Sequence, residues 1–419
     1  MPNVGGVVAM MRALLRHARS TWLAPAPRWV ALGSPGIPLE FATDEGYRVV
    51  TVPLSAQTRE GYIRFKEAIW RSFHGPRGLE RLAISDYQAF VEYNHATAQR
   101  LLEAVDDFDL LFINDFQQIL AGGLIGAEAP SLLQWHIPLE FRGYPEPVRR
   151  FFLKSLEGFD AIVVSTRAGL EELLRRGFHG RAFQVYPYLD PREQLPAPAG
   201  GVATFRDRFN LHDRSYILSV SRHDPVKRQD LLLHAFARLR REFPELRLVL
   251  AGGRSFSTGL HALREPDKAE TWQRHLAAEI RRLKLRDAVV LTGTLDPEEL
   301  RAAYDGASVF AHPAPWEGFG LVAVEAWMHR VPIVVSRGAG VAELVNPGVN
   351  GFLAAPGSVS ELTGRLRETL RRPELAVRMG ESGAMTARQC HVDVAAPRLK
   401  EIFSHTIRLY SRTGLGPHG

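Results

Sequence analysis

Short apolar runs rich in β-forming residues alternate with amphipathic stretches along the whole chain, and this alternation restricts the fold more than any other feature. The helical stretches, such as QDLLLHAFARLRREF and PEELRAAYDGA, have apolar residues three and four apart. Runs that are apolar on both faces and separated by helices predict parallel sheets covered by helices, an α/β class. We expect strands at RWVAL (28–32), YRVVTV (47–52), DLLFI (109–113), SLLQWH (131–136), DAIVVS (160–165), FQVYP (183–187), YILSVS (216–221), LRLVLAG (246–252), AVVLTG (288–293), SVFAHP (308–313) and PIVVS (332–336).

A chain of 419 residues is too long for one ordinary core, which favours two domains. The segment 189–205 is rich in Pro, Gly and Ala and is the best candidate for a connection between them. We therefore expect an N-terminal domain at 1–193, a linker at 194–205, a C-terminal domain at 206–385 and a last helical segment at 386–419. Two Rossmann-like domains that face each other would bind a ligand in an interdomain cleft, outside the carboxyl ends of their strands.

The charge of the chain excludes some partners. The net charge is +6, but only six of the 52 basic residues are Lys, and the Arg residues are spread along the chain. No basic stripe or tail is visible, so we do not expect a nucleic-acid partner. No apolar run approaches the roughly 20 residues that span a bilayer, and the apolar N-terminal segment lacks the preceding basic residues of a signal peptide. Cys390 is the single cysteine, which excludes an intrachain disulfide and suits a reducing, cytoplasmic setting. The oligomeric state stays open, a homo-oligomer included.

Two cations follow the expected strand 216–221. Arg222 and Lys227 lie in SVSRHDPVKRQD, and a lysine is rare in this chain. Fixed cations at the end of a strand suit a diphosphate, whose charge must be neutralised as it leaves. Alternatively, Arg222 and Lys227 are two solvated cations in a loop, and these residues alone do not distinguish the two interpretations.

The stretch PWEGFGLVAVEAW (315–327) places two glutamates around a glycine-flanked turn that leads into a helix. Gly318 and Gly320 allow a close approach to the backbone, and amides at a helix start, here those of Phe319, Gly320 and Leu321, can bind an anion. The alternative is that Glu317 and Glu325 only favour a helix N-terminus. For Glu325, among apolar neighbours, that explanation is poor, because an unpaired inward carboxylate is costly.

This arrangement resembles the retaining nucleotide-sugar glycosyltransferases of the GT-B fold, family 4 type. The resemblance lies in Glu317 and Glu325 eight residues apart, in the residues around Arg222 and Lys227, in NGFLAAPGSVSEL (350–362) and in VLTGTLDPEELRAAYDGASVF (290–310). It implies that Arg222 and Lys227 hold the donor diphosphate and that Glu325 holds the ribose. Glu317 and the amides from Gly318 to Leu321 would hold the sugar, and the base would lie near Gly293, Thr294 and Leu295. A metal would not be required, and the last helix, near 391–410, would return to the N-terminal domain.

In the first half, Gly5-Gly6 precedes a helical run and corresponds in that family to a loop near the donor phosphate. Such a loop should follow a strand of about five residues, and only Met-Pro-Asn-Val stands before it. We expect either that the true start lies upstream or that the sheet is completed in another way.

Asp115 and His136 each end one of two consecutive expected strands. An isolated His is more often structural than catalytic, but two polar groups at neighbouring strand ends favour a site. AIWRSFH (68–74), DYQAFVEYNHATAQRLLE (86–103), INDFQQIL and HIPLE resemble the trehalose-6-phosphate synthases. That resemblance implies that Asp115 and His136 contact the acceptor and donor hexoses and that Trp70 lies by the acceptor. Arg254 is the candidate ligand for an acceptor phosphate.

Together these features predict a retaining transferase that moves a hexosyl group from a nucleotide sugar to a small sugar acceptor. We expect a glucosyl group from UDP-, ADP- or GDP-glucose, glucose or glucose 6-phosphate as the acceptor, and a trehalose-type product. His136, Asp115 and Glu317 would be catalytic, with no tightly bound cofactor. Other acceptors stay open, namely glycerate, glycerol phosphate, a lipid or a polysaccharide, although we do not expect a membrane partner. The alternative function is not enzymatic: the protein would be a regulator that binds a nucleotide sugar without transferring the sugar.

Overall fold

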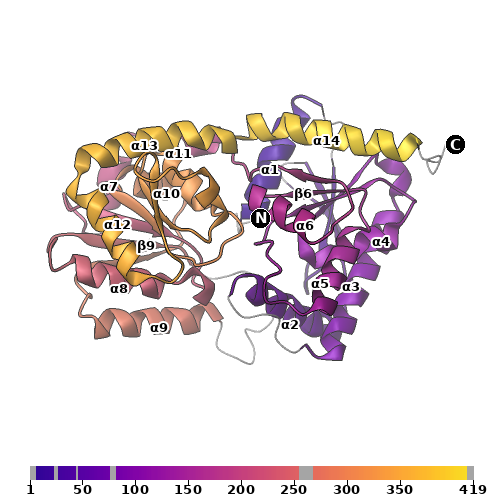
Figure 1. Cartoon of the computed structure of the whole chain (residues 1–419), viewed down its shortest axis with the longest axis horizontal. Helices are drawn as coiled ribbons and strands as arrows, with labels where there is room; N and C mark the ends of the chain where they lie inside the picture. The colour runs from indigo at the N-terminus through magenta and orange to yellow at the C-terminus, as the bar shows by residue number, and fades with distance from the viewer. Residues whose placement is uncertain (1–5, 23–26, 44–45, 76–81, 254–267, 413–419) are drawn as a thin grey trace. The chain divides into compact units, whose positions relative to one another are not determined.

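The computed structural model describes residues 6–22, 27–43, 46–75, 82–253 and 268–412. The chain divides into two compact units, the first made of Met1–Pro187 together with Val392–Gly419, and the second of Tyr188–His391. Figure 1 labels the elements of both. Each unit is an α/β structure with parallel sheets, which confirms the predicted fold class.

The sheet of the second unit has six strands, and every neighbouring pair is parallel. Its strands are β8 (Tyr216–Val220), β9 (Arg247–Ala251), β10 (Val289–Gly293), β11 (Val309–His312), β12 (Ile333–Ser336) and β13 (Gly351–Ala354). The order is β10-β9-β8-β11-β12-β13, so the chain builds outward from β8 in one direction and then from β11 in the other. The reversal between β8 and β11 is the point at which doubly wound sheets bind ligands.

Helices cover both faces of this sheet. One face carries α8 (Gln229–Leu239), α9 (Lys268–Arg282) and α12 (Val359–Arg371), and α8 contacts the other two. The contacting pairs α7–α10 and α11–α13 lie on the other face: α7 (Gly201–Arg208), α10 (Pro297–Asp305), α11 (Leu321–Met328) and α13 (Pro373–Ala387). Because both faces are covered, β9, β11 and β12 are buried along their whole length.

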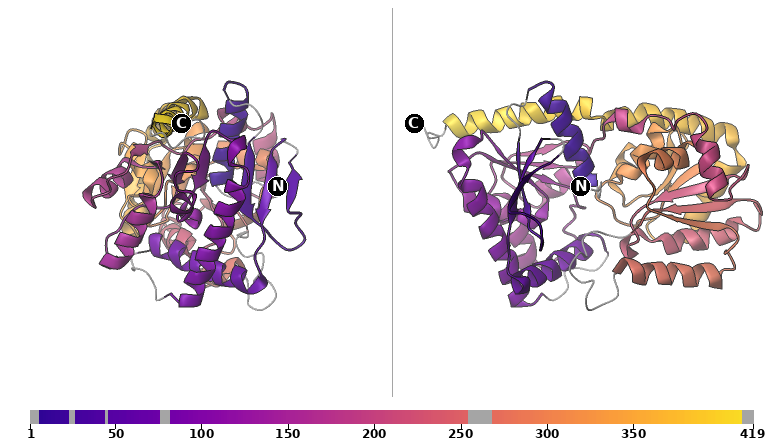
Figure 2. Two further views of the ribbon diagram at one scale, coloured as in Figure 1. Left: turned by 90° about the vertical axis from the view of Figure 1, so that its right-hand side faces the viewer. Right: turned by 180° about the vertical axis from the view of Figure 1, so that it is seen from behind.

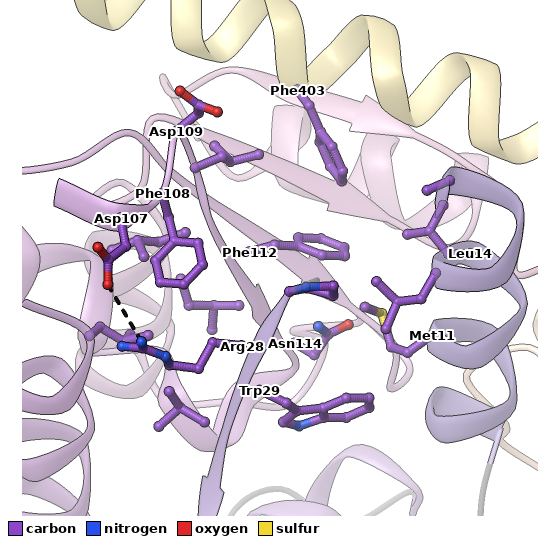
Figure 3. Close-up of a pocket in the computed structure, with 18 of the residues that line it drawn as sticks. Met11, Leu14, Arg28, Trp29, Asp107, Phe108, Asp109, Phe112, Asn114 and Phe403 are labelled. Atoms are coloured by element: carbon purple, nitrogen blue, oxygen red, sulfur yellow. Dashed lines mark hydrogen bonds and ion pairs between the residues drawn. The ribbon is translucent and has the colours of Figure 1, made fainter. Parts of the chain in front are cut away.

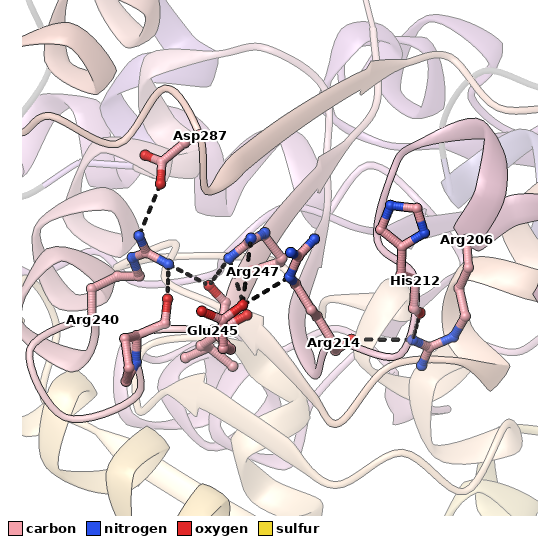
Figure 4. A network of polar contacts seen from close by, with 9 residues as sticks. Arg206, His212, Arg214, Arg240, Glu245, Arg247 and Asp287 are labelled. Atoms are coloured by element: carbon pink, nitrogen blue, oxygen red, sulfur yellow. Dashed lines mark hydrogen bonds and ion pairs between the residues drawn. The ribbon is translucent and has the colours of Figure 1, made fainter.

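Arginines at the amino ends of β8 and β9 are paired rather than free to form a basic patch (Figure 4). Nε of Arg214 donates to Glu245 at 2.9 Å, and Nη2 of Arg240 donates to Asp287 at 3.0 Å. Burial lowers the pKa of Arg247, and the neighbouring guanidinium groups of Arg214 and Arg240 lower it further. This network lies at the end of the sheet opposite the carboxyl ends of the strands, so we assign it to stability.

The first unit contains two sheets instead of one. Strands β1 (Arg28–Leu32), β3 (Arg48–Val52) and β2 (Glu40–Ala42) form the smaller sheet, in which β1 and β3 are parallel and β2 is antiparallel. The larger sheet is parallel, in the order β4 (Leu111–Asn114), β5 (Ser131–Trp135), β6 (Ala161–Val164) and β7 (Ala182–Gln184). Among the described residues, no hydrogen-bonded ladder joins the two sheets.

The helices of this unit are α1 (Gly6–Arg19), α2 (Ala56–Phe73), α3 (Ile84–Leu102), α4 (Ala121–Ile125), α5 (Glu146–Leu156), α6 (Arg167–Arg175) and α14 (Val392–Arg412). Helix α3 packs on α2, β1 and β3, and the rings of Phe65 and Phe90 stack at 4.3 Å between α2 and α3. The last helix, α14, packs on α1 and β5, and Figure 2 shows it running over α1. Nδ1 of His17 in α1 lies 3.1 Å from Oδ1 of Asp393 in α14.

All the strands expected from the sequence are present, and two further strands were not expected. The unexpected strands are β2 and β13, which are short and contain Ala or Gly, residues with weak β-propensity. The expected linker also differs from the structure, since the division lies at Pro187/Tyr188 and α7 begins at Gly201 within 194–205. Tertiary contacts override the loop-like composition there: Phe205 is buried, and the amide of Ala197 donates to Asp305 at 2.6 Å.

Candidate active site

The loops that follow β8 and β11 meet at the reversal of strand order in the second unit. After β8 the chain passes through a short 3₁₀ turn, Pro225–Lys227, and after β11 it reaches Glu317 and then α11. These two loops bring Lys227 and Glu317 into direct contact as an ion pair. The sequence motifs around Arg222/Lys227 and Glu317/Glu325 therefore come together at the place where this fold class binds ligands.

The Lys227–Glu317 pair is largely shielded from water, with side-chain exposures of 11% and 15%. Nε2 of His312, the last residue of β11, lies 3.4 Å from Oε2 of Glu317. His312 is buried; its Nδ1 has no hydrogen-bond partner among the described residues, and its Nε2 makes only this long contact with Glu317. A buried ring nitrogen without a hydrogen bond is costly, and the position of His312 beside Glu317 suits a ligand that supplies a hydrogen bond.

Backbone hydrogen bonds fix the loop that carries Glu317. The amide of Glu317 donates to Gly338 at 3.2 Å, the amide of Gly340 donates to Glu317 at 3.1 Å, and the amide of Val341 donates to Phe319 at 2.8 Å. A Cβ atom on Gly338 would lie 1.9 Å from the carbonyl oxygen of Pro315, so only glycine fits there. The carboxylate of Glu317 is thus held by a rigid frame, as a binding group should be.

Gly320 ends this loop with φ +99°, a left-handed conformation that favours glycine, and α11 begins at the next residue. The first amides of a helix have no partner within the helix and lie at the positive end of its dipole. An anion next to the loop would find both donors and a favourable field at the start of α11.

Glu325 lies on α11, one turn beyond Leu321, and is half-buried. The hydroxyl of Tyr304 donates to Oε2 of Glu325 at 2.8 Å and also contacts the carbonyl of Val322 at 3.2 Å. Burial raises the pKa of Glu325, while the hydrogen bond from Tyr304 and the nearby His329 act in the opposite direction. Tyr304 therefore orients one carboxylate oxygen and leaves the other available for a ligand hydroxyl.

The other residues that the sequence predicts for donor binding lie at the carboxyl ends of β8 and β10, and Gly253 follows β9. Arg222 is half-buried after β8, and Thr294 and Leu295 follow β10, the first exposed and the second half-buried. A Cβ atom on Gly253, after β9, would lie 2.2 Å from Oγ1 of Thr294, so a larger residue there would displace the Thr294 hydroxyl.

In the first unit, Asp115 and His136 follow β4 and β5 and lie next to each other. The amide of His136 donates to Oδ1 of Asp115 at 3.3 Å, and the amide of Asp115 donates to the carbonyl of Gln134 at 2.7 Å. Asp115 is buried and has φ +68°, a strained conformation for a residue with a side chain. Burial raises its pKa to about 6, against hydrogen bonds from the backbone amides of His136, Phe116 and Ile137 that favour the charged form.

His136 is neutral at physiological pH, because burial lowers its pKa to about 3. Its Nε2 lies 2.9 Å from Oδ1 of Asn114, so Nε2 carries the proton and donates it to the amide oxygen. Nδ1 then has a lone pair and, among the described residues, no partner. A neutral acceptor next to a buried carboxylate can receive hydrogen bonds from sugar hydroxyls.

Trp70 lies on α2 with its ring stacked on His74, the centroids 3.7 Å apart. Tyr62, also on α2, is close enough to Asp115 for the carboxylate to help raise its pKa, although burial is the larger cause. Gly6 is the first residue of α1, whereas Gly5 and Arg254 lie outside the described residues.

Three residues at these sites were not singled out from the sequence. Asn114 and His312 are the last residues of their strands. A polar residue at the end of a strand predicts a site residue, as it did for Asp115, so both could have been found in this way. Tyr304 gave no signal, because its contact with Glu325 depends on how α10 and α11 pack.

Comparison with known families matches residues 203–385 to the model described as "Glycosyl transferases group 1". This range contains β8 to β13 and the residues from Arg222 to Glu325 that the sequence predicts for donor binding. The resemblance to this glycosyltransferase family that the sequence predicts is therefore confirmed over residues 203–385.

A D-inositol 3-phosphate glycosyltransferase of Streptomyces avermitilis is 30% identical over 284 residues. The match covers 66% of this chain and 58% of that relative. The chain thus spans less than two thirds of the length of this relative.

Two solved structures share the fold of nearly the whole chain. An α,α-trehalose 6-phosphate synthase from Burkholderia multivorans aligns with a TM-score of 0.81 at 20% identity, over 99% of this chain and 95% of that one. An α,α-trehalose-phosphate synthase (UDP-forming) from Burkholderia xenovorans, in complex with glucose-6-phosphate, aligns with a TM-score of 0.81 at 19% identity, over 96% of both chains. Among the described residues, no helix has the length and apolar character needed to cross a membrane.

Proposed function

We propose that this chain, which carries a group 1 glycosyltransferase domain over residues 203–385, transfers a hexosyl group from a nucleotide sugar to a small sugar acceptor with retention of configuration. The second unit would hold the donor, and the first unit would hold the acceptor. We infer that the sugar is glucosyl and the acceptor glucose or glucose 6-phosphate, which gives a trehalose-type product.

The observation that carries this proposal is the meeting of Lys227 and Glu317 at the start of α11. One site then offers a cation and helix amides for a diphosphate, and a carboxylate for the hydroxyl groups of the attached sugar. Arg222, on the same loop as Lys227, adds charge for the diphosphate. Glu325 would accept hydrogen bonds from the ribose, near Thr294 and Leu295 for the base.

The reaction breaks the bond between the anomeric carbon and the diphosphate oxygen, and it forms a bond from the same carbon to an acceptor oxygen. The acceptor hydroxyl loses its proton to the departing diphosphate oxygen on the same face of the sugar, which accounts for retention. The charge that develops on the diphosphate is the largest change in the transition state. Lys227, Arg222 and the amides of α11 would stabilise it as preorganised donors.

Asp115 and His136 support a polar acceptor with several hydroxyl groups. The buried carboxylate and the free Nδ1 of His136 are both hydrogen-bond acceptors, which suits hydroxyl donors rather than a lipid tail. The likeness to the synthase that binds glucose-6-phosphate favours a hexose among such acceptors.

The test is the release of nucleoside diphosphate from UDP-, ADP- and GDP-glucose, with each acceptor offered in turn. We expect glucose or glucose 6-phosphate to stimulate release and to yield a non-reducing disaccharide. Inositol 3-phosphate must be in the panel, because the Streptomyces avermitilis relative is named for it. Release could instead be stimulated by inositol 3-phosphate, glycerate, glycerol phosphate or a lipid and by neither hexose. That result would support the transferase activity and contradict the trehalose-type product. Tight binding of a nucleotide sugar with neither transfer nor hydrolysis would favour the non-catalytic regulator.

Glu325→Gln is expected to weaken nucleoside diphosphate binding about 10- to 100-fold, since a hydrogen bond to a charged group contributes about 1.5–3 kcal/mol. The amide keeps the size of the side chain and can still accept the hydrogen bond from Tyr304. Calorimetric titration measures the affinity, and Glu374→Gln on the exposed start of α13 is the matched control. Equal affinities in the two variants would contradict the ribose assignment.

A further inference from the structure

A second polar pair lies next to Tyr304 and Glu325 in the second unit. Asp305 is the last residue of α10, and His329 follows α11, one turn beyond Glu325. Nδ1 of His329 lies 2.6 Å from Oδ1 of Asp305. The imidazole ring is almost parallel to the ring of Tyr304, at 13° with the centroids 5.3 Å apart. Because the Tyr304 hydroxyl donates to Glu325, the four side chains form one continuous series of contacts.

The pair is shielded from water and fixed by the backbone around it. The side chain of His329 is 1% exposed, and that of Asp305 is 19% exposed. The amide of Ala197 donates to Oδ2 of Asp305 at 2.6 Å, so both oxygens of this carboxylate have a hydrogen-bond partner. The backbone amide of His329 donates to the carbonyl of Glu325 at 3.1 Å. The imidazole is therefore held from both sides, by Asp305 and by the ring of Tyr304.

The hydrogen bond of this pair runs from the imidazole to the carboxylate. Burial acts to raise the pKa of Asp305, but hydrogen bonds from His329 and from the amide of Ala197 bring that pKa below its usual value. Asp305 is thus ionised at neutral pH and can only accept, so Nδ1 of His329 carries the proton. Nε2 of His329 is buried and has no partner among the described residues. Packing alone does not explain this pair, since apolar side chains of the same shape would avoid the cost of burying it.

The pair acts on the carboxylate of Glu325 in two ways. Burial raises the pKa of Glu325, and the electrostatic influence of His329 acts against that shift, which favours the ionised form. His329 also restricts the ring of Tyr304, whose hydroxyl donates to Oε2 of Glu325 at 2.8 Å. A carboxylate that is ionised and already held in one orientation loses less side-chain freedom when it binds hydroxyl groups.

We propose that Asp305 and His329 are positioning residues for Glu325. They hold the ring of Tyr304, whose hydroxyl fixes this carboxylate, and so prepare it for the two vicinal hydroxyl groups of a ribose. The ribose as ligand rests on the proposed function, whereas the coupling of the four side chains does not. Neither residue of the pair would touch the nucleotide. Their loss should therefore raise KM for the donor through weaker recognition of the ribose and leave kcat nearly unchanged.

The experiment compares UDP, ADP and GDP with their 2′,3′-dideoxy forms by calorimetric titration, because the ratio of the two affinities measures recognition of the ribose hydroxyl groups alone. We expect the wild type to favour the ribose form about 10- to 100-fold. Asp305→Asn should lower this ratio about 3- to 10-fold, the effect of one hydrogen bond. His329→Phe keeps a ring against Tyr304 but has no donor for Asp305, and it should lower the ratio similarly. An equal loss of affinity for both forms, with an unchanged ratio, would overturn the proposal.

A double-mutant cycle tests whether the effect passes through Tyr304. Tyr304→Phe removes the hydroxyl that donates to Glu325 and should itself lower the ratio. In this background Asp305→Asn should change the ratio less than about twofold, because the contact that it acts through is already lost. Independent, additive effects of the two substitutions would contradict the positioning role.

The matched control is an Asp–His pair in the first unit. Nδ1 of His17 in α1 lies 3.1 Å from Oδ1 of Asp393 in α14. These two helices border a mainly apolar cavity of about 460 Å³, into which Figure 3 shows Leu14 and Phe403 directed. His17 lies near the end of α1 that is opposite Gly6. Asp393→Asn removes the same type of hydrogen bond and should leave the ratio at its wild-type value. A loss equal to that of the tested variants would overturn the proposal.

A second measurement needs no nucleotide. Nitrogen NMR of the histidine rings in the ligand-free protein, with His329→Phe to assign the signal, should show a proton on Nδ1 of His329. Both Asp305→Asn and Glu325→Gln should shift this signal, since both side chains are coupled to the ring. An unchanged signal in Glu325→Gln would overturn the proposal. A protein that shows these shifts but binds none of the three nucleotides would count against the proposed function and not against the positioning of Glu325.

Discussion

Replacing Lys227 with alanine is expected to lower kcat/KM for sugar transfer about 100- to 1,000-fold, a loss of about 2.7–4 kcal/mol of transition-state stabilisation. Lys227 is the cation that the structure places against Glu317 at the start of α11, where the diphosphate charge would develop. The charge of a leaving group grows during the reaction, so kcat should fall along with kcat/KM. Steady-state kinetics with a saturating acceptor measures both constants.

The control for this variant is Lys154→Ala, which removes a lysine from α5 that is exposed and paired with Glu157. It should have wild-type kinetics. Because Lys227→Ala leaves the shielded carboxylate of Glu317 without its cation, some loss of stability is also expected. Adding Glu317→Gln should recover the Tm but not the activity. Near-normal turnover of Lys227→Ala, or recovery of turnover in the double variant, would contradict the assignment.

The sequence could predict the strands and most of the chemistry at their ends because both depend on short-range patterns. Runs such as YILSVS and PIVVS are apolar on both faces, and Arg222, Glu317, Asp115 and His136 lie at the end of such a run or within four residues of it. In a parallel sheet, the order of the strands then decides which of these loops meet. The meeting of Lys227 with Glu317, residues far apart in the chain, follows from β8 lying beside β11.

Features that depend on packing between distant segments could not be predicted in this way. The Tyr304–Glu325 hydrogen bond requires the position of α10 relative to α11, and α7 forms in a loop-like composition because Phe205 is buried. The raised pKa of Asp115 likewise results from burial, which no local pattern encodes.

Asp115→Asn is expected to make the protein more stable above pH 6 and much less active. Burial raises the pKa of Asp115 to about 6 from the usual 3.8, so the folded protein binds a proton more readily than the unfolded chain. The ionised carboxylate therefore destabilises the fold by about 2–3 kcal/mol above pH 6, and this cost disappears as the pH falls toward 4. Asparagine is neutral and tolerates the positive φ at this position, so the variant avoids the cost. Urea unfolding at pH 8 and pH 4.5 measures the difference, which should be present at pH 8 and small at pH 4.5.

The activity of the same variant shows whether this cost serves a function. If the ionised carboxylate orients an acceptor hydroxyl, kcat/KM of the wild type should fall as the pH drops below about 6, with the pKa of Asp115. Asp115→Asn should reduce kcat/KM about 100-fold at pH 8 and abolish the acid limb, since general base and orienting groups contribute about 10²–10⁴. His136→Gln is the matched control, because the pKa of His136 is about 3 and its loss should lower the rate while leaving the limb near pH 6 in place. If kcat/KM of Asp115→Asn still falls below about pH 6, another group is responsible for that pH dependence. The carboxylate of Asp115 would then have no role in transfer.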